Sequence, residues 1–284
     1  MSLDEIRRLS LVAMVSDDEL METLVLKGGN ALVLVHDVGQ RTSLDLDFSI
    51  ASEFPDLDDV RQRVFRNLHR TFAEAGMVVF DEDFIPKPAE PGPDKPSWWG
   101  GYFIEFKLAD KETFAKFKHD PAALRRNAAV VGPNQRRKYT IDISKNEYTA
   151  AKVKRVVDDF TVYVYSLEMI VIEKLRAICQ QMPAYELAGA TRSPRARDFY
   201  DIFQICQREH VRVQAETNRP LFVEIFKAKA VALALLAGVR DTHGYHALDW
   251  PAVELSIAGP HEDFQFYFDF VVGLIEELKP LWME

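Results

Sequence analysis

Two aspartates, Asp45 and Asp47, are the residues of this sequence best suited by type and spacing to hold a divalent metal ion. They lie in Ser43–Phe48, where polar and apolar residues alternate with a period of two and so predict a strand. Side chains two apart on a strand point to the same face, with Cα atoms about 6.5–7 Å apart. Mg²⁺ or Mn²⁺ binds such hard oxygen ligands and leaves other positions to water or substrate phosphates. The pair therefore predicts metal-assisted chemistry on a phosphate group.

A glycine pair upstream is suited to cradle the phosphates. Gly28-Gly29 follow a short apolar run, and Asn30 is placed to cap a helix that begins there. Glycine lets the backbone approach a phosphate closely, and the first amides of a helix point their N–H groups at it. Arg41 and Ser43, on the approach to the carboxylate strand, are each placed to contact phosphate oxygens. Each pattern alone is common without function, but together and in this order they favour nucleotide binding.

A third carboxylate would complete such a metal site, and Asp142 is the candidate. It alternates with apolar residues in Tyr139–Ser144, which predicts a strand with one wet face. An ordinary solvated aspartate explains this position about as well. Asp110 and Glu105 are weaker alternatives, and Glu105 is the better placed of the two.

The later half of the chain carries a lysine at an unusual place. Lys174 falls within the apolar stripe of a predicted helix, Ser166–Cys179. A lysine directed toward the core needs an anionic partner, or its stem lies along the apolar surface while its ammonium reaches water.

A second helix in that half opens with paired acids. Ser193-Pro194 predicts its N-cap and a proline in its first turn, and Asp198 and Asp201 then share one face. Acidic residues in a first turn also favour the helix dipole, and Arg197 is spaced to pair with Asp201, so a purely structural interpretation is open.

These residues carry a resemblance to a known family. Lys27–Leu32, Arg41–Phe48, Glu173–Leu175 and Arg197–Asp201 resemble, in the same order, the motifs of the AbiEii/AbiGii-type abortive-infection toxin nucleotidyltransferases. That family belongs to the polymerase-beta-like nucleotidyltransferase superfamily. Asn30 departs mildly from it, because a threonine or another small residue is frequent there.

The resemblance implies a fold, an activity and partners. It implies an α+β polymerase-beta-like fold, in which a mixed sheet bears the metal-binding aspartates and a helical C-terminal domain follows. It also implies transfer of a nucleotide from an NTP to an acceptor such as tRNA or another RNA, by a toxin with a cognate antitoxin protein. In the same likeness Lys174 contacts the triphosphate, Asp198 is the functional acid, and Asp201 is structural.

Periodicity outlines the two parts of the chain independently of any resemblance. Residues 1–163 mix helices and strands, whereas residues 164–284 read as helices, with the boundary near Phe160–Ser166. The expected elements not yet named are the helices Asp58–Glu74, Arg195–Gln207, Pro220–Ala237 and Glu262–Leu281, the strands Met77–Phe80 and Gly101–Leu108, and a hairpin of Val153–Val157 with Thr161–Tyr165.

Composition narrows the class of protein. The formal net charge of −9 argues against a general nucleic-acid binder, but residues 121–155 hold nine basic and two acidic residues and predict a basic patch for a polyanion. The two cysteines, Cys179 and Cys206, fit no metal-ligand spacing and are expected to be buried thiols. No signal peptide or membrane-spanning stretch is apparent in the sequence, which predicts a cytoplasmic protein without a membrane partner.

Two other functions fit the same residues. A nucleotidyltransferase that modifies a small molecule, of the antibiotic-modifying type, predicts that the basic stretch 121–155 lies away from the site. A catalytically lapsed nucleotide-binding partner protein is disfavoured, because both strand aspartates are retained.

Overall fold

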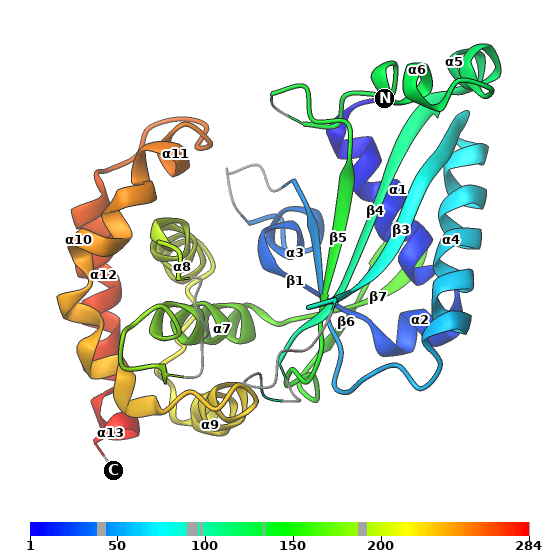
Figure 1. The fold of residues 1–284 in the computed structure, drawn as a ribbon. Helices are drawn as coiled ribbons and strands as arrows, with labels where there is room; N and C mark the ends of the chain where they lie inside the picture. Colours follow the sequence, from blue (N-terminus) through cyan, green and yellow to red (C-terminus); the bar gives the residue numbers. More distant parts are fainter. Residues whose placement is uncertain (39–43, 90–95, 97–98, 133, 187–191, 284) are drawn as a thin grey trace. The chain divides into compact units, whose positions relative to one another are not determined.

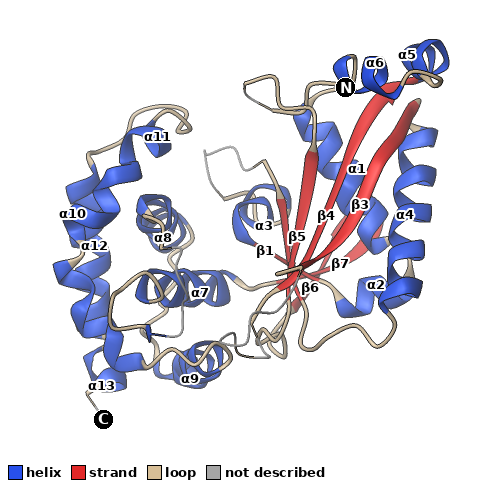
Figure 2. Cartoon of the chain, in the orientation of Figure 1, coloured by secondary structure: helices blue, strands red, loops and turns tan. Residues whose placement is uncertain are grey.

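The computed structural model describes the chain except residues 39–43, 90–95, 97–98, 133, 187–191 and 284. The chain forms two compact units. The first comprises Met1–Val35, Ser43–Pro91 and Gly100–Val164, and the second comprises Tyr165–Glu284 together with the short segments His36–Thr42 and Gly92–Trp99. A seven-stranded mixed sheet with helices makes up the first unit, and the described part of the second is built from helices (Figure 2). The α+β fold class predicted from the sequence is confirmed.

The sheet has the strand order β3-β4-β5-β2-β1-β7-β6. At its centre β2 is parallel to β5 and antiparallel to β1, while β1 is parallel to β7. The strands are β1 (Val25–Lys27), β2 (Leu46–Ser49), β3 (Met77–Lys87), β4 (Gly101–Asp110), β5 (Tyr139–Ser144), β6 (Val153–Val157) and β7 (Phe160–Val164).

The two faces of the central strands differ in polarity. Leu46 and Phe48 of β2 and Ile141 and Ile143 of β5 are fully buried on one face. The helices α1 (Leu3–Val15) and α4 (Leu57–Glu74) cover that face, where Phe72 of α4 packs on the sheet (Figure 1). The opposite face, on which α3 (Gly28–Leu34) lies, therefore carries the alternate, polar residues of β2 and β5.

The edge strand β3 is longer than its sequence predicts. It runs to Lys87 rather than ending at Phe80, and its pairing with β4 shifts register between Phe80 and Asp83. Pro86 belongs to this strand because an edge strand need not donate every N–H to a neighbour. Beyond β4, the short helices α5 (Lys111–Phe117) and α6 (Pro121–Arg126) pack apolar side chains against Phe80.

The helices of the second unit largely follow the predicted spans, with two exceptions. The expected helix Pro220–Ala237 is wrong, because α9 ends at Lys227, Ala230 has a positive φ of 50°, and a 3₁₀ helix follows from Leu233. The expected helix Glu262–Leu281 ends early, at Glu277, shortly before Pro280. The remaining elements are α2 (Asp18–Thr23), α7 (Leu167–Cys179), α8 (Ala196–Arg208), η2 (Glu216–Asn218), α9 (Arg219–Lys227), η3 (Leu233–Asp241), α10 (His243–His246), η4 (Ala247–Asp249), α11 (Trp250–Glu254), α12 (Phe264–Glu277) and α13 (Lys279–Trp282).

Aromatic rings fill the core between α8 and α12. Phe199 of α8 packs against Phe264 and Phe268 of α12, with ring centroids 5.4 and 5.2 Å apart. These contacts hold in place the helix α8, which carries Asp198 in its first turn. Within the described residues, no helix has the length and apolar character required to cross a membrane.

Candidate functional site

The glycine turn brings the backbone directly against a carboxylate. Strand β1 ends at Lys27, and α3 begins at Gly28, whose φ of +71° is rarely adopted by other residues. A Cβ atom at Gly28 would stand 2.7 Å from Oδ2 of Asp47, closer than any side chain tolerates. Only glycine at this position therefore leaves the Asp47 carboxylate where it lies.

Asn30 has a different role from the predicted helix cap. Because α3 already begins at Gly28, Asn30 lies inside the helix and is completely buried. Its Nδ2 donates a hydrogen bond of 2.6 Å to the backbone carbonyl of Asp45. Asn30 thus ties the glycine turn to the start of the carboxylate strand.

Asp47 and Asp142 lie side by side on adjacent strands. They pair in register between the parallel strands β2 and β5, so their side chains point to the same face at a strand spacing of about 4.8 Å. Asp45 lies one residue before β2, next to Thr140 of β5, whose hydroxyl donates to it. All three aspartates predicted as metal ligands are therefore neighbours on the polar face of the sheet.

Basic side chains already contact two of these carboxylates. Nη2 of Arg136 is 2.6 Å from Oδ1 of Asp45, and Nζ of Lys87 is 2.6 Å from Oδ2 of Asp142. On the other side of Asp47, Lys27 is its partner in β1 and reaches Ser144 (3.1 Å) and Glu147 (3.4 Å). Asp45 and Asp142 are therefore partly neutralised by cations from two separate segments of the chain.

The donor set fits a divalent metal ion in kind. Carboxylate oxygens are the ligands that Mg²⁺ and Mn²⁺ prefer, and the glycine at position 28 keeps the space beside Asp47 free of a side chain. In the described part of the chain, however, no three Asp, Glu, His or Cys side chains converge as a ready-made metal cluster. Asp45 and Asp142 must exchange their basic partners for the ion.

The two weaker candidates for a third carboxylate have other partners. Glu105 of β4 pairs with Lys138 at 2.6 Å, and Asp110 caps α5 by accepting a 2.7 Å hydrogen bond from the Thr113 amide. Neither lies in register beside Asp47, as Asp142 does. The sheet thus brings together the glycine turn and the three aspartates predicted from the sequence. The predicted phosphate contacts Arg41 and Ser43 lie outside the described residues.

In the second unit, Lys174 joins Asp198 and Asp201 in a buried ion cluster. Its Nζ is 2.8 Å from each carboxylate, and all three residues are at most 5% exposed. Burial acts to lower the pKa of Lys174, but the two carboxylates outweigh it and raise this pKa. For Asp198, burial acts to raise the pKa, but Arg195 and Lys174 lower it well below its ordinary value. Lys174 and Asp198 are therefore charged.

The N-terminus of α8 is capped by residues from far along the chain. The Arg195 amide donates to Nδ1 of His246, and the Ala196 amide donates to Oδ1 of Asp249, both at 3.0 Å. The predicted cap at Ser193 is therefore wrong, since α8 begins at Ala196. Sequence reasoning missed His246 and Asp249 because no local spacing links them to α8. Burial lowers the pKa of His246 to about 4, so its ring is neutral near pH 7.

Comparison with known proteins decides the family. The family described as "Nucleotidyl transferase AbiEii toxin, Type IV TA system" matches residues 10–272. The chain belongs to this family. The predicted resemblance is confirmed, and so is the prediction that the chain is a nucleotidyltransferase.

Solved structures that are similar to this AbiEii-family chain have low sequence identity to it. JHP933 from Helicobacter pylori is 17% identical, with 98% of this chain and 91% of that chain covered and a TM-score of 0.49. An antigenic nucleotidyltransferase-like protein from Paracoccidioides brasiliensis is 15% identical, with 89% and 94% covered and a TM-score of 0.37. No curated protein sequence matches.

The basic stretch of this AbiEii-family chain does not form the single patch predicted from the sequence. Arg136 reaches the aspartates through Asp45, whereas Arg125 of α6 pairs with Asp81 at 2.6 Å. Lys154 and Arg155 belong to β6, an edge strand separated from β5 by β2, β1 and β7. Residues consecutive in sequence are thus distributed across the width of the sheet.

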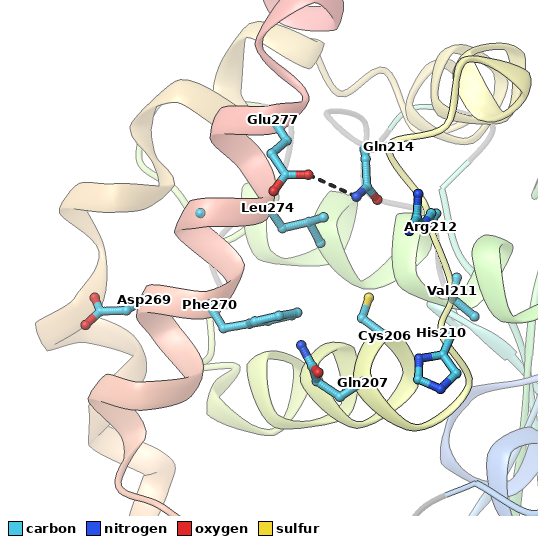
Figure 3. A pocket seen from close by; sticks show the side chains of 11 residues that line it. Cys206, Gln207, His210, Val211, Arg212, Gln214, Asp269, Phe270, Leu274 and Glu277 are labelled. Atoms are coloured by element: carbon cyan, nitrogen blue, oxygen red, sulfur yellow. Dashed lines mark hydrogen bonds between the residues drawn. The ribbon is translucent and has the colours of Figure 1, made fainter.

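An open groove in the second unit was not predicted. It has a volume of about 590 Å³ and lies between the C-terminal part of α8 and α12, with Cys206, Phe270 and Arg212 in its lining (Figure 3). Burial raises the pKa of Cys206 to about 12, so the thiol stays protonated and is no nucleophile at neutral pH. Cys206 is eight residues beyond Asp198, about 12 Å along the helix. The groove is therefore separate from the ion cluster.

Proposed function

We propose that this AbiEii-family nucleotidyltransferase uses Mg²⁺ or Mn²⁺ to transfer a nucleotide from an NTP to an RNA acceptor, with tRNA as the first acceptor to test. One observation carries the proposal: Asp47 and Asp142 lie in register on one sheet face, and the Gly28 turn brings the backbone against Asp47 with no side chain between them. Nucleotide transfer needs metal-held phosphates close to backbone amides, and this arrangement suits that need.

The proposal assigns each residue of the first unit a role. Asp45, Asp47 and Asp142 would hold the metal ion, which would supply activation of the attacking oxygen and charge neutralisation for the leaving pyrophosphate. Gly28 and Gly29 let the backbone amides approach the triphosphate. Arg41 and Ser43 remain predicted phosphate contacts from the sequence.

The proposal extends to Lys174 and Asp198 in the second unit. Lys174 now holds the carboxylates of Asp198 and Asp201, so a triphosphate contact requires it to exchange one of them for a phosphate oxygen. Asp198 would then assist by keeping the lysine charged and oriented. Membership of a type IV toxin–antitoxin family supports a cognate antitoxin as a further partner of this chain.

A labelling experiment tests the reaction. Each of the four common NTPs, carrying ³²P in its α-phosphate, is offered with Mg²⁺ or Mn²⁺ to total RNA, to purified tRNA, to protein and to a panel of small-molecule acceptors. We expect label in RNA with at least one NTP. Label in none of the acceptors would refute the transfer reaction and favour the lapsed nucleotide-binding protein.

Transfer to a small molecule is the second candidate, and one observation favours it. A small-molecule acceptor predicts that the basic stretch 121–155 lies away from the site. Part of this stretch does so, because Lys154 and Arg155 lie on an edge strand. Label in the small-molecule arm without label in RNA would decide for this alternative.

The variant Asp47→Asn tests whether the site is where we place it. It removes a metal-binding charge but keeps the side-chain size, so transfer should fall about 100-fold or more while the fold is kept. Asp81→Asn is the matched control, because Asp81 lies on the same sheet but pairs with Lys107 and Arg125. Near-normal turnover by Asp47→Asn would place the metal site elsewhere.

A further inference from the structure

Arg136 makes a contact that a metal-loaded site cannot keep. Its Nη2 is 2.6 Å from both Oδ1 of Asp45 and Oγ1 of Thr140, and Thr140 donates to the same Oδ1 atom. One oxygen of Asp45 thus accepts from two donors at once. A divalent ion that uses this oxygen must displace the guanidinium.

The backbone around Arg136 is held while its guanidinium is partly accessible. The backbone carbonyl of Arg136 accepts a 2.7 Å hydrogen bond from the Val131 amide, and Arg136 forms a β-bridge with Gly132. A Cβ at Gly132 would lie 3.4 Å from Cδ of Arg136, so the glycine leaves just enough room for the arginine stem. The Arg136 side chain is 30% exposed. Its Nε also donates a 2.9 Å hydrogen bond to the carbonyl of Lys138, and loss of this bond and of the contact to Asp45 lets the charged end move without refolding the loop.

The neighbouring basic residues are engaged elsewhere. Arg137 donates to the carbonyl of Ala128, and Lys138 pairs with Glu105 at 2.6 Å. Of these three consecutive cations, Arg136 is the one that reaches a proposed metal ligand. The side chain of Asp45 is 44% exposed, and ion pairs this exposed are weak, so a divalent cation can displace the guanidinium.

We infer that Arg136 is a placeholder cation, which neutralises Asp45 in the free protein and binds the triphosphate once metal and NTP arrive. A guanidinium is planar, stays charged, and matches two phosphate oxygens at once, so the displaced group suits this second partner. The inference rests on the proposed nucleotide-transfer function and adds to it a phosphate-binding residue that the sequence motifs do not include.

The placeholder role predicts opposite effects on two binding constants. Removing the guanidinium takes away the competitor for Asp45, so Mn²⁺ alone should bind more tightly to Arg136→Gln than to the wild type, by about two- to fivefold. The same change removes a phosphate contact, so the NTP should bind about tenfold more weakly in the presence of saturating Mn²⁺. A merely structural arginine would not produce this opposition of signs.

The experiment measures both constants on the full chain. Mn²⁺ alone is titrated with detection of the free ion by electron paramagnetic resonance, and each of the four common NTPs is then titrated by calorimetry at saturating Mn²⁺. Arg136→Lys keeps the charge but not the planar fork, and its two constants should fall between those of the wild type and Arg136→Gln. Circular dichroism on every variant verifies the fold.

Two control variants separate this role from a general loss of charge. Arg125→Gln removes an arginine from an aspartate pair elsewhere in the same unit, and Lys138→Gln removes a cation two residues away that contacts Glu105. Both controls should bind Mn²⁺ and NTP as the wild type does. Controls that change both constants as Arg136→Gln does would overturn the inference, because the effect would then be one of net charge.

The remaining outcomes distinguish the inference from the function on which it rests. If the wild type binds both Mn²⁺ and an NTP while Arg136→Gln leaves either constant unchanged, the placeholder role is wrong and the proposed function stands. If the wild type binds neither Mn²⁺ nor any NTP, the proposed function fails and the inference with it.

Discussion

Replacing Gly28 with alanine tests the close approach of the glycine turn to the proposed metal site. The added Cβ would meet Oδ2 of Asp47 at 2.7 Å and its Cβ and Cγ at 3.3 Å, whereas ordinary contact begins at 3.4 Å. Because the overlap involves the whole short side chain and not only its tip, Asp47 must move. We therefore expect Gly28→Ala to lose both stability and affinity for Mn²⁺.

Comparison with a second glycine separates the expected loss of stability into two parts. Gly76 has a similar φ of +79°, but a Cβ there would meet nothing within 4 Å. Gly76→Ala should therefore cost only the backbone strain, about 1–2 kcal/mol. Gly28→Ala should add an overpacking cost of about 1–3 kcal/mol from Asp47. The effect of alanine on the unfolded chain is common to both variants and cancels in their comparison.

Urea denaturation measures the stability of each variant, and Mn²⁺ titration measures its affinity for the metal ion. Gly28→Ala should be less stable than Gly76→Ala, and it should bind Mn²⁺ at least about tenfold more weakly, as expected for a displaced ligand. Gly76→Ala should bind Mn²⁺ as the wild type does. Equal stability of the two variants together with wild-type Mn²⁺ affinity of Gly28→Ala would refute the reasoning.

Two further predictions concern the second unit. Lys174→Met should lower the free energy of unfolding by about 3–5 kcal/mol in urea denaturation, because it removes the buried cation that contacts Asp201 and leaves Asp198 with Arg195 alone. A loss under 1 kcal/mol would show that the cluster is not held by the lysine. The folded-state pKa of His246, about 4, lies below the ordinary histidine value of 6.5, so its neutral ring contributes stability that is complete above pH 6.5 and decreases as pH falls toward 4. His246→Asn keeps an acceptor for the Arg195 amide but does not titrate, so urea denaturation from pH 7.5 to 4.5 should show a shallower loss of stability than in the wild type, by up to roughly 1.4 kcal/mol per pH unit. Identical pH profiles would contradict this account of His246.

Local periodicity predicted those elements whose burial pattern is regular. The alternation in Tyr139–Ser144 and the helical spacing in Asp58–Glu74 match β5 and α4 closely. It failed where the chain is governed by partners distant in sequence. Strand β3 continues to Lys87 because β4 pairs with it throughout, and the helix predicted across Ala230 breaks where that residue adopts a positive φ.

The candidate site divides in the same way. The sequence identified Asp45 and Asp47 as a pair, because their spacing alone places both on one strand face. It also placed Lys174 within an apolar stripe, which already required an anionic partner or an exit to water. It did not reveal which partners these would be, and Asp198 and Asp201 lie more than twenty residues along the chain.

By itself, therefore, the sequence determined the family, the α+β class and the residue types that can do the chemistry. Only the tertiary structure decided that Asp142 lies in register beside Asp47, that Gly28 presses against that carboxylate, and that Arg136 neutralises Asp45. The physical reason is that strand order and register bring together residues about ninety positions apart. Such pairings depend on how the whole sheet buries its apolar face, and no local spacing records them.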